Sequence, residues 1–164
     1  MQFIQRWDQK TSQLCLSHSY NQFQARISRW VSRSGDGPFY LLAGVLLAWL
    51  DGARGLGFFL CTLKAFTLEL PIYWLIKNSL KRERPRNVPV FITPSDRYSL
   101  PSGHTAAAFL MAELVSGFYP MGLWCAFVWA GFIGASRLLL GVHYLSDLVA
   151  GACLGLLTAW CVLP

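Results

Sequence analysis

The chain has 164 residues and a formal net charge of +6; 54% of its residues are hydrophobic, 15% are aromatic and only 13% are charged. Soluble domains usually carry about 25% charged residues, so this composition excludes an ordinary soluble domain and indicates a protein whose solvent is the lipid bilayer. The length favours one domain over two.

The first 34 residues differ from the rest, because apolar and basic residues recur with helical spacing instead of forming one apolar run. The apolar residues that fall near one helical face are Phe3, Ile4, Trp7 and Leu14, and further on Phe23, Ile27, Trp30 and Val31. This pattern is typical of a helix lying in the membrane interface, and a helix packed across the bundle is the alternative. We expect residues 1–34 to be an amphipathic interfacial segment and residues 35–164 to be a single membrane domain.

Five apolar stretches approach the length of about 20 residues that a membrane-spanning helix needs. They are Gly37–Leu50, Gly55–Ile76, His104–Tyr119, Met121–Leu139 and His143–Val162. The sequence therefore predicts an all-α, polytopic membrane bundle of about five transmembrane helices. Five crossings place the N-terminal segment, the polar loop 77–103 and the turn at 139–143 on the same side of the membrane.

Three charged residues lie inside the predicted spans, where an unpaired charge is costly. They are Lys64, Glu69 and Glu113. By helical rise, Glu69 lies roughly 12 Å below Lys77, too deep for chemistry at the membrane surface. We expect a structural role, in which Lys64 pairs with one of the two glutamates.

Polar residues gather in three clusters on the side that the loop and the turn share. The clusters are Lys77 with Arg84-Pro85, Pro101-Ser102-Gly103-His104, and Ser136-Arg137 with His143 and Asp147. A basic run beside a span is by itself typical of headgroup contact, and a single Arg or His can cap a helix. The combination of all three clusters instead favours a catalytic site.

Three cations in this set suit a phosphoryl group, whose transfer depends on positioning and on stabilisation of negative charge. Lys77, Arg84 and Arg137 supply the positive charge, and the two guanidinium groups suit bidentate contacts with phosphate. Ser102 and Gly103 open a helix, where free N–H groups form an anion site. We expect these five residues to bind phosphate.

His143 and Asp147 are four residues apart, so on a helix they lie on one face. Asp147 would then fix the tautomer of His143, which attacks phosphorus, while His104 protonates the leaving group. The reaction has two steps, formation of a phosphohistidine and its hydrolysis by water. With three cations present, we expect no metal and no cofactor.

The patterns K-x(6)-R-P, P-S-G-H and S-R-x(5)-H-x(3)-D resemble the three-part signature of the type 2 phosphatidic acid phosphatase superfamily, and they match it without departure. The resemblance covers about residues 35 to 160. It implies a helical bundle that hydrolyses phosphomonoesters or diphosphates without a metal. It also implies the roles given above: His143 as nucleophile, Asp147 as its partner, His104 as general acid, and the other five residues as phosphate binders.

The size and the five spans resemble the compact bacterial members that act on isoprenoid diphosphates, phosphatidylglycerophosphate or lipid A. We therefore predict an integral membrane lipid phosphatase whose substrate is of the undecaprenyl diphosphate, phosphatidylglycerophosphate or phosphatidic acid type. A lipid A phosphatase and a lipid-to-lipid phosphotransferase are the enzyme alternatives, and a silent lipid-binding or transport protein is the non-enzyme alternative. The expected partners are the lipid substrate and the bilayer, not nucleic acid.

Two arguments about orientation in the bacterial inner membrane disagree. Of the 14 Lys and Arg residues, all except Arg54 and Lys64 fall on the catalytic side, which the positive-inside rule places in the cytoplasm. The family resemblance implies a site facing the periplasm or exterior. Because phosphate binding accounts for at least three of these cations, we expect the periplasmic orientation.

Overall fold

The computed structural model describes residues 2–164, which form seven α-helices and one short 3-10 helix. The elements are α1 Gln2–Leu16, α2 Asn21–Arg33, α3 Gly37–Leu50, α4 Gly52–Leu80, α5 Gly103–Phe118, η1 Pro120–Gly122, α6 Leu123–Leu139 and α7 Leu145–Val162. The predicted all-α class is confirmed.

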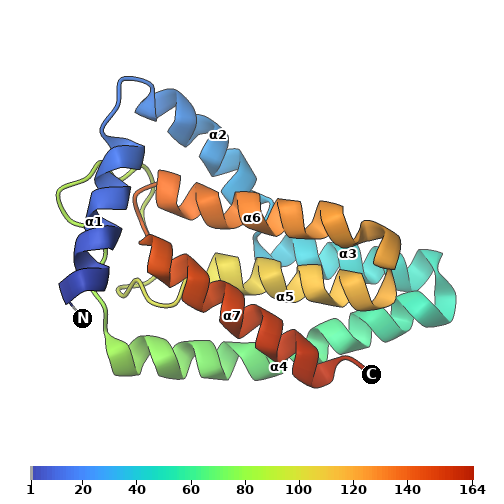
Figure 1. The fold of residues 1–164 in the computed structure, drawn as a ribbon. Helices are drawn as coiled ribbons and strands as arrows, with labels where there is room; N and C mark the ends of the chain where they lie inside the picture. Colours follow the sequence, from blue (N-terminus) through green and yellow to red (C-terminus); the bar gives the residue numbers. More distant parts are fainter. Residues whose placement is uncertain (1) are drawn as a thin grey trace.

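Helix α5 lies inside the bundle, where it contacts α4, α6 and α7, while α3 and α4 form an antiparallel hairpin and α2 packs on α6. Figure 1 shows α1 lying across the end of the bundle where α4 ends and α7 begins, with the C-terminus at the opposite end. The long connection 81–102 lies at the same end as α1. This end therefore gathers all three of the polar clusters.

Two stretches of the described residues are long and apolar enough to cross a membrane, 52–80 and 120–139, and α3 and most of α7 form shorter apolar helices. Large apolar side chains are exposed along these elements, among them Trp49, Trp124 and Trp160. An exposed apolar surface of this extent marks contact with a membrane or another protein.

Helix α4 is longer than predicted, because it continues from Ile76 to Leu80 instead of giving way to a loop at residue 77. Lys81 ends the helix in the left-handed conformation, with φ of 47°. Lys77 lies in the last turn of the helix, as its good helix propensity allows, and its ammonium group pairs with a carboxylate of the following loop. The predicted polar loop thus begins four residues late, and Lys77 projects from the last turn of a helix.

The N-terminal helices bury mainly polar and small residues and expose most of their large apolar ones. The buried set consists of Asp8, Ser12, Leu16, Ala25, Ser28 and Ser32. Phe3, Trp7 and Trp30 are more than half exposed, at 71%, 60% and 69%. The predicted amphipathic pattern is therefore present, with its apolar face pointing away from the bundle.

Helices α5 and α7 approach each other closely through two glycines one turn apart. A Cβ atom on Gly155 would lie 2.1 Å from the carbonyl oxygen of Ala106, and one on Gly151 would lie 2.5 Å from that of Ser102. Small residues spaced in this way let helix backbones touch, as in membrane helix pairs. The start of α5 is thereby held against the start of α7.

The predicted pairing of Lys64 with a buried glutamate is wrong. Lys64 is exposed, and within residues 2–164 it forms no ion pair with Glu69 or Glu113. Five residues separate Lys64 from Glu69, which corresponds to about 140° around a helix, so the two side chains point to different faces. Glu69 is buried against the neighbouring helices.

Gly155→Ala should destabilise the fold, because its Cβ atom would meet the α5 backbone, which cannot move aside without displacing α5. We expect a loss of about 1–3 kcal/mol, seen as a lower Tm of the detergent-solubilised protein. Gly131→Ala is the matched control, since nothing lies within 4 Å of the added atom. Equal Tm values for the two variants would contradict this account of the α5–α7 contact.

Candidate active site

The end of α4 and the loop after it bring two predicted phosphate-binding cations to one carboxylate. The Lys77 ammonium nitrogen lies 2.8 Å from Oδ2 of Asp96, and the Arg84 guanidinium lies 2.6 Å from Oδ1. The Tyr73 hydroxyl also donates to Oδ2, at 2.8 Å. Lys77 and Arg84, which were predicted to bind phosphate, thus bind the two oxygens of another anion, the Asp96 carboxylate.

Asp96 is strongly held in its charged form. Burial favours the neutral acid, but the hydrogen bonds from Lys77 and Tyr73 and the charges of Lys77 and Arg84 outweigh it and hold the pKa of Asp96 below its ordinary value. A phosphate that bound both cations would have to replace this carboxylate.

The Pro101–His104 segment begins α5, with Ser102 in an extended conformation at the N-cap and completely buried. The backbone N–H of Ser102 donates to the carbonyl of Asp147, at 3.1 Å, which links the second cluster to the third. A Cβ atom on Gly103 would lie 3.0 Å from the Tyr73 ring, so a glycine fits this crowded position.

His104 is held by a carboxylate that the sequence motifs do not contain. Nε2 of His104 lies 2.9 Å from Oδ1 of Asp36, which precedes α3. A carboxylate partner fixes the orientation of the ring, and a general acid must be held in a defined position toward its leaving group. Asp36 therefore belongs with the candidate site.

Arg137 projects from the last turn of α6 and is buried. One of its terminal nitrogens donates to the hydroxyl of Ser32 on α2, at 2.7 Å, whereas Nε has no hydrogen-bond partner among the described residues. A buried N–H without a partner is unfavourable. Arg137 therefore has a donor free to bind an anion.

His143 lies in the turn between α6 and α7, with a different group at each ring nitrogen. Nε2 is 3.5 Å from Nη1 of Arg84, and Nδ1 is 3.7 Å from Oδ2 of Asp147. The second distance exceeds that of a hydrogen bond, and a small rotation of the ring would close it. Arg84 also donates to the carbonyl of Val142, which holds this turn against the loop.

The surroundings of His143 favour its neutral form. Burial first, and then the nearby positive charges of Arg137 and Arg84, lower the pKa of His143 to about 4, although Asp147 opposes them. A neutral imidazole keeps a lone pair on one nitrogen, which is the form a nucleophile requires.

The structure thus gathers the eight predicted residues around the loop 81–102 and the starts of α5 and α7, and it adds groups that the motifs did not reveal. The additions are Asp36, Tyr73, Asp96, and Arg82 with Asp8. Asp96 was visible in the sequence as one of two acids opposing a basic loop. For Asp36, Tyr73, Arg82 and Asp8 no local sequence pattern indicated a place in the site, because their partners lie 23 or more positions away in the chain.

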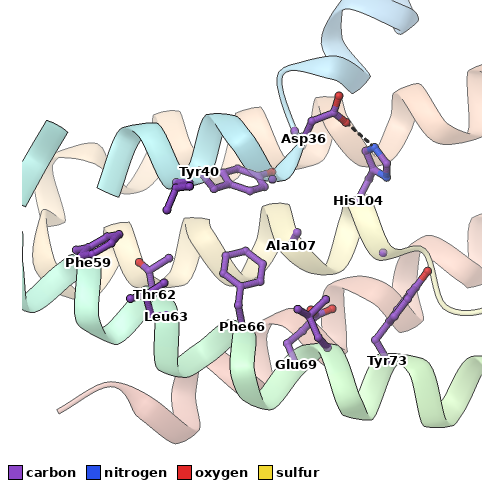
Figure 2. A pocket seen from close by; sticks show the side chains of 15 residues that line it. Asp36, Tyr40, Phe59, Thr62, Leu63, Phe66, Glu69, Tyr73, His104 and Ala107 are labelled. Carbon is purple, nitrogen blue, oxygen red and sulfur yellow. Dashed lines mark hydrogen bonds and ion pairs between the residues drawn. The ribbon is translucent and has the colours of Figure 1, made fainter. Parts of the chain in front are cut away.

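An apolar cavity of about 390 Å³ lies between α3, α4 and α5, beside the candidate site. Figure 2 shows His104 and Asp36 at one end of it, Phe59 at the other, and Tyr40 and Phe66 between them. Exposed leucines of α3 and α4 also line the cavity, so it opens on the apolar outer surface: Leu41, Leu63 and Leu70. The site therefore adjoins a space suited to hydrocarbon.

A family model described as the PAP2 superfamily matches residues 55–164, which contain all three motifs. The chain belongs to the PAP2 superfamily. The resemblance inferred from the motifs is thereby confirmed. Helices α1 to α3 precede the part that the PAP2 model matches.

Two curated proteins match part of this chain in sequence, and their names differ. Decaprenylphosphoryl-5-phosphoribose phosphatase of Mycobacterium tuberculosis is 40% identical over 88 residues, which is 49% of this chain and 46% of the relative. Bacitracin transport permease protein BcrC of Bacillus licheniformis is 43% identical over 61 residues, 37% of this chain and 30% of the relative. The chain thus matches less than half the length of either PAP2 relative.

Two crystal structures share the fold over nearly the whole chain. The transmembrane PAP2-type phosphatidylglycerolphosphate phosphatase from Bacillus subtilis has a TM-score of 0.80 and 23% identity, covering 99% of this chain and 85% of the other. LpxE of Aquifex aeolicus has a TM-score of 0.82 and 22% identity, covering 96% and 94%. The likeness shows the fold alone, and it includes α1 and α2, which the PAP2 model does not match.

Asp96→Asn should strengthen the binding of an anion at the candidate site, because it removes the negative charge that neutralises Lys77 and Arg84. We expect inorganic phosphate to bind about tenfold more tightly, since hydrogen bonds to charged groups contribute about 1.5–3 kcal/mol. Calorimetric titration of the purified protein measures the affinity. Asp51→Asn, which changes a carboxylate on the turn between α3 and α4, is the control, and unchanged or weaker binding in Asp96→Asn would contradict the prediction.

Proposed function

We propose that this chain is an integral membrane lipid phosphatase that hydrolyses a lipid phosphomonoester or diphosphate through a phosphohistidine intermediate, without a metal. The observation that carries the proposal is the setting of His143, a buried imidazole with Arg84 at one nitrogen and Asp147 behind the other. A nucleophile beside phosphate-binding cations and backed by a carboxylate is the arrangement that phosphoryl transfer requires.

In the first step Nε2 of His143 donates its lone pair to phosphorus, and the bond between phosphorus and the leaving oxygen breaks. Nδ1 keeps its proton and shares it with Asp147, which stabilises the positive charge that develops on the ring. The leaving oxygen takes a proton from His104, which Asp36 holds in place. The products are the phosphohistidine and the free alcohol or the shortened phosphate ester.

In the second step a water molecule attacks the phosphohistidine, and neutral His104 accepts a proton from that water. The bond between phosphorus and Nε2 breaks, its electron pair returns to His143, and inorganic phosphate leaves. Lys77, Arg84 and Arg137 hold the phosphoryl oxygens through both steps, with the amides at the start of α5. Three fixed cations can perform the charge stabilisation that a metal ion provides in other phosphatases.

The apolar cavity supports a lipid as the substrate. It begins beside His104 and opens at the exposed leucines of α3 and α4, so a phosphate could reach the site while its hydrocarbon chain stays in contact with the bilayer. The relatives named for polyprenyl and glycerol lipids agree with this class. The substrate we propose is of the undecaprenyl diphosphate, phosphatidylglycerophosphate or phosphatidic acid type.

We further propose that α3 to α7 are five transmembrane helices of the bacterial inner membrane and that the site faces the periplasm. Helices α1 and α2 lie in the interface, where their exposed aromatic residues contact lipid. This arrangement supports the division into an interfacial segment and a membrane domain over 35–164.

His143→Ala should abolish phosphate release from lipid substrates in detergent micelles, with a loss of about 10⁴-fold or more, as for other catalytic nucleophiles. His104→Ala should lower the rate by about 10²–10⁴-fold, the usual contribution of a general acid. His18→Ala, in the turn between α1 and α2, is the control. Assays of undecaprenyl diphosphate, phosphatidylglycerophosphate and phosphatidic acid with EDTA present identify the substrate; full activity in His143→Ala, or a strict need for metal, would refute the mechanism.

The acidic limb of the pH profile should report His143. Because its pKa lies near 4 in the folded protein rather than at 6.5, His143 stays neutral, and therefore reactive, down to that pH. Below it, protonation removes the lone pair, and kcat/KM should fall about tenfold per pH unit. Measurement of kcat/KM from pH 3 to 8 tests this, and an acidic limb near 6.5 would show that burial does not depress the pKa.

A further inference from the structure

Arg82 lies between Lys77 and Arg84 in the sequence, but its side chain contacts Asp147 and Asp8 instead of joining the proposed phosphate binders. Its Nη1 donates to Oδ1 of Asp147, at 2.7 Å, and its Nη2 lies 2.6 Å from Oδ2 of Asp8. One guanidinium group thus joins two carboxylates, one on α7 and one on α1. The planar guanidinium fork suits this arrangement, whereas a lysine presents a single point charge.

Asp8 is buried although it belongs to an amphipathic helix with an exposed apolar face. Only 4% of it is exposed, and besides Arg82 it accepts hydrogen bonds from the backbone N–H and the hydroxyl of Ser146. A buried carboxylate is costly without partners, and here all of its partners lie in the loop 81–102 or at the start of α7. Asp8 therefore fixes α1 to the first turn of the helix that carries Asp147.

The two oxygens of Asp147 have different neighbours. Oδ1 accepts from Arg82, while Oδ2 accepts from the backbone N–H of Tyr144, at 2.8 Å, and faces Nδ1 of His143. The Arg82 guanidinium also lies over the ring of Tyr144, 4.5 Å from its centre. The carboxylate is thus held from both sides, with one defined oxygen toward His143.

We propose that Arg82 and Asp8 are positioning residues, which hold Asp147 so that its Oδ2 faces His143 and which make α1 a working part of the catalytic unit. The proposal rests on the function proposed above, in which Asp147 orients the nucleophile. The side chains of Arg82 and Asp8 hydrogen-bond to Asp147, Ser146 and each other, and not to any of the five residues proposed to bind phosphate, so we expect their effect to reach the reaction through Asp147. Partners that orient metal-ligating side chains commonly contribute about 10- to 100-fold, and we expect an effect of the same order for a carboxylate that orients a nucleophile.

The test measures kcat and KM of full-length variants on the lipid that the wild-type protein hydrolyses, together with Tm. Arg82→Ala should lower kcat by about 100-fold and Asp8→Asn by about tenfold, with KM changed by less than about threefold. Arg82→Lys should recover part of the loss, because it restores the charge without the fork. Arg86→Ala is the matched control, since this exposed arginine of the same loop forms an ion pair only with Glu83 within residues 2–164 and should keep wild-type activity.

A double-mutant cycle separates positioning from a general loss of structure. If Arg82 acts through Asp147, adding Arg82→Ala to Asp147→Asn should cost no further activity, whereas independent effects would multiply. A raised KM with unchanged kcat in Arg82→Ala, multiplying losses in the cycle, or losses in Arg82→Lys and Asp8→Asn that merely follow a lower Tm would overturn the proposal. These outcomes differ from failure of the proposed function, which appears as activity in His143→Ala.

Discussion

Gly151 and Gly155 let the backbone of α7 touch that of α5, and the position of the candidate site depends on this contact. Without it the N–H of Ser102 could not reach the carbonyl of Asp147, and His104 would not begin a helix beside the turn that carries His143. The glycines bear no chemistry themselves. They set the distance between the N-terminal ends of α5 and α7, and each end carries some of the candidate catalytic residues. Small residues allow membrane helices to approach this closely.

The cations at and beside the candidate site fall into two groups, those paired with a carboxylate and one that is not. Lys77, Arg84 and Arg82 are each paired with a carboxylate, so the folded protein neutralises them in the absence of substrate. Arg137 contacts only a hydroxyl among the described residues and keeps one N–H without a partner. Since unpaired buried charge is destabilising, Arg137 is the cation that gains most from an arriving anion, whereas Lys77 and Arg84 exchange one anion for another.

How far the sequence could predict the molecule depended on how local each signal was. The bounds of α3 agree with the prediction, because Asp51-Gly52 ends its apolar run, and the eight predicted site residues lie in short motifs with fixed spacing. The predicted end of α4 is wrong, because polar residues from Lys77 onward indicate a loop although the helix continues to Leu80. The contact of Asp8 with Arg82 joins residues 74 positions apart, so only packing reveals it.

The position of α1 also bears on how the protein should be handled in the laboratory. Asp8 lies within the first two turns of the described chain and contacts the helix that carries Asp147 through Arg82 and Ser146, whereas the C-terminus lies at the far end of the bundle (Figure 1). An affinity tag or fusion partner attached before α1 would therefore crowd the reacting groups. Tags and immobilisation chemistry placed after α7 would lie away from them.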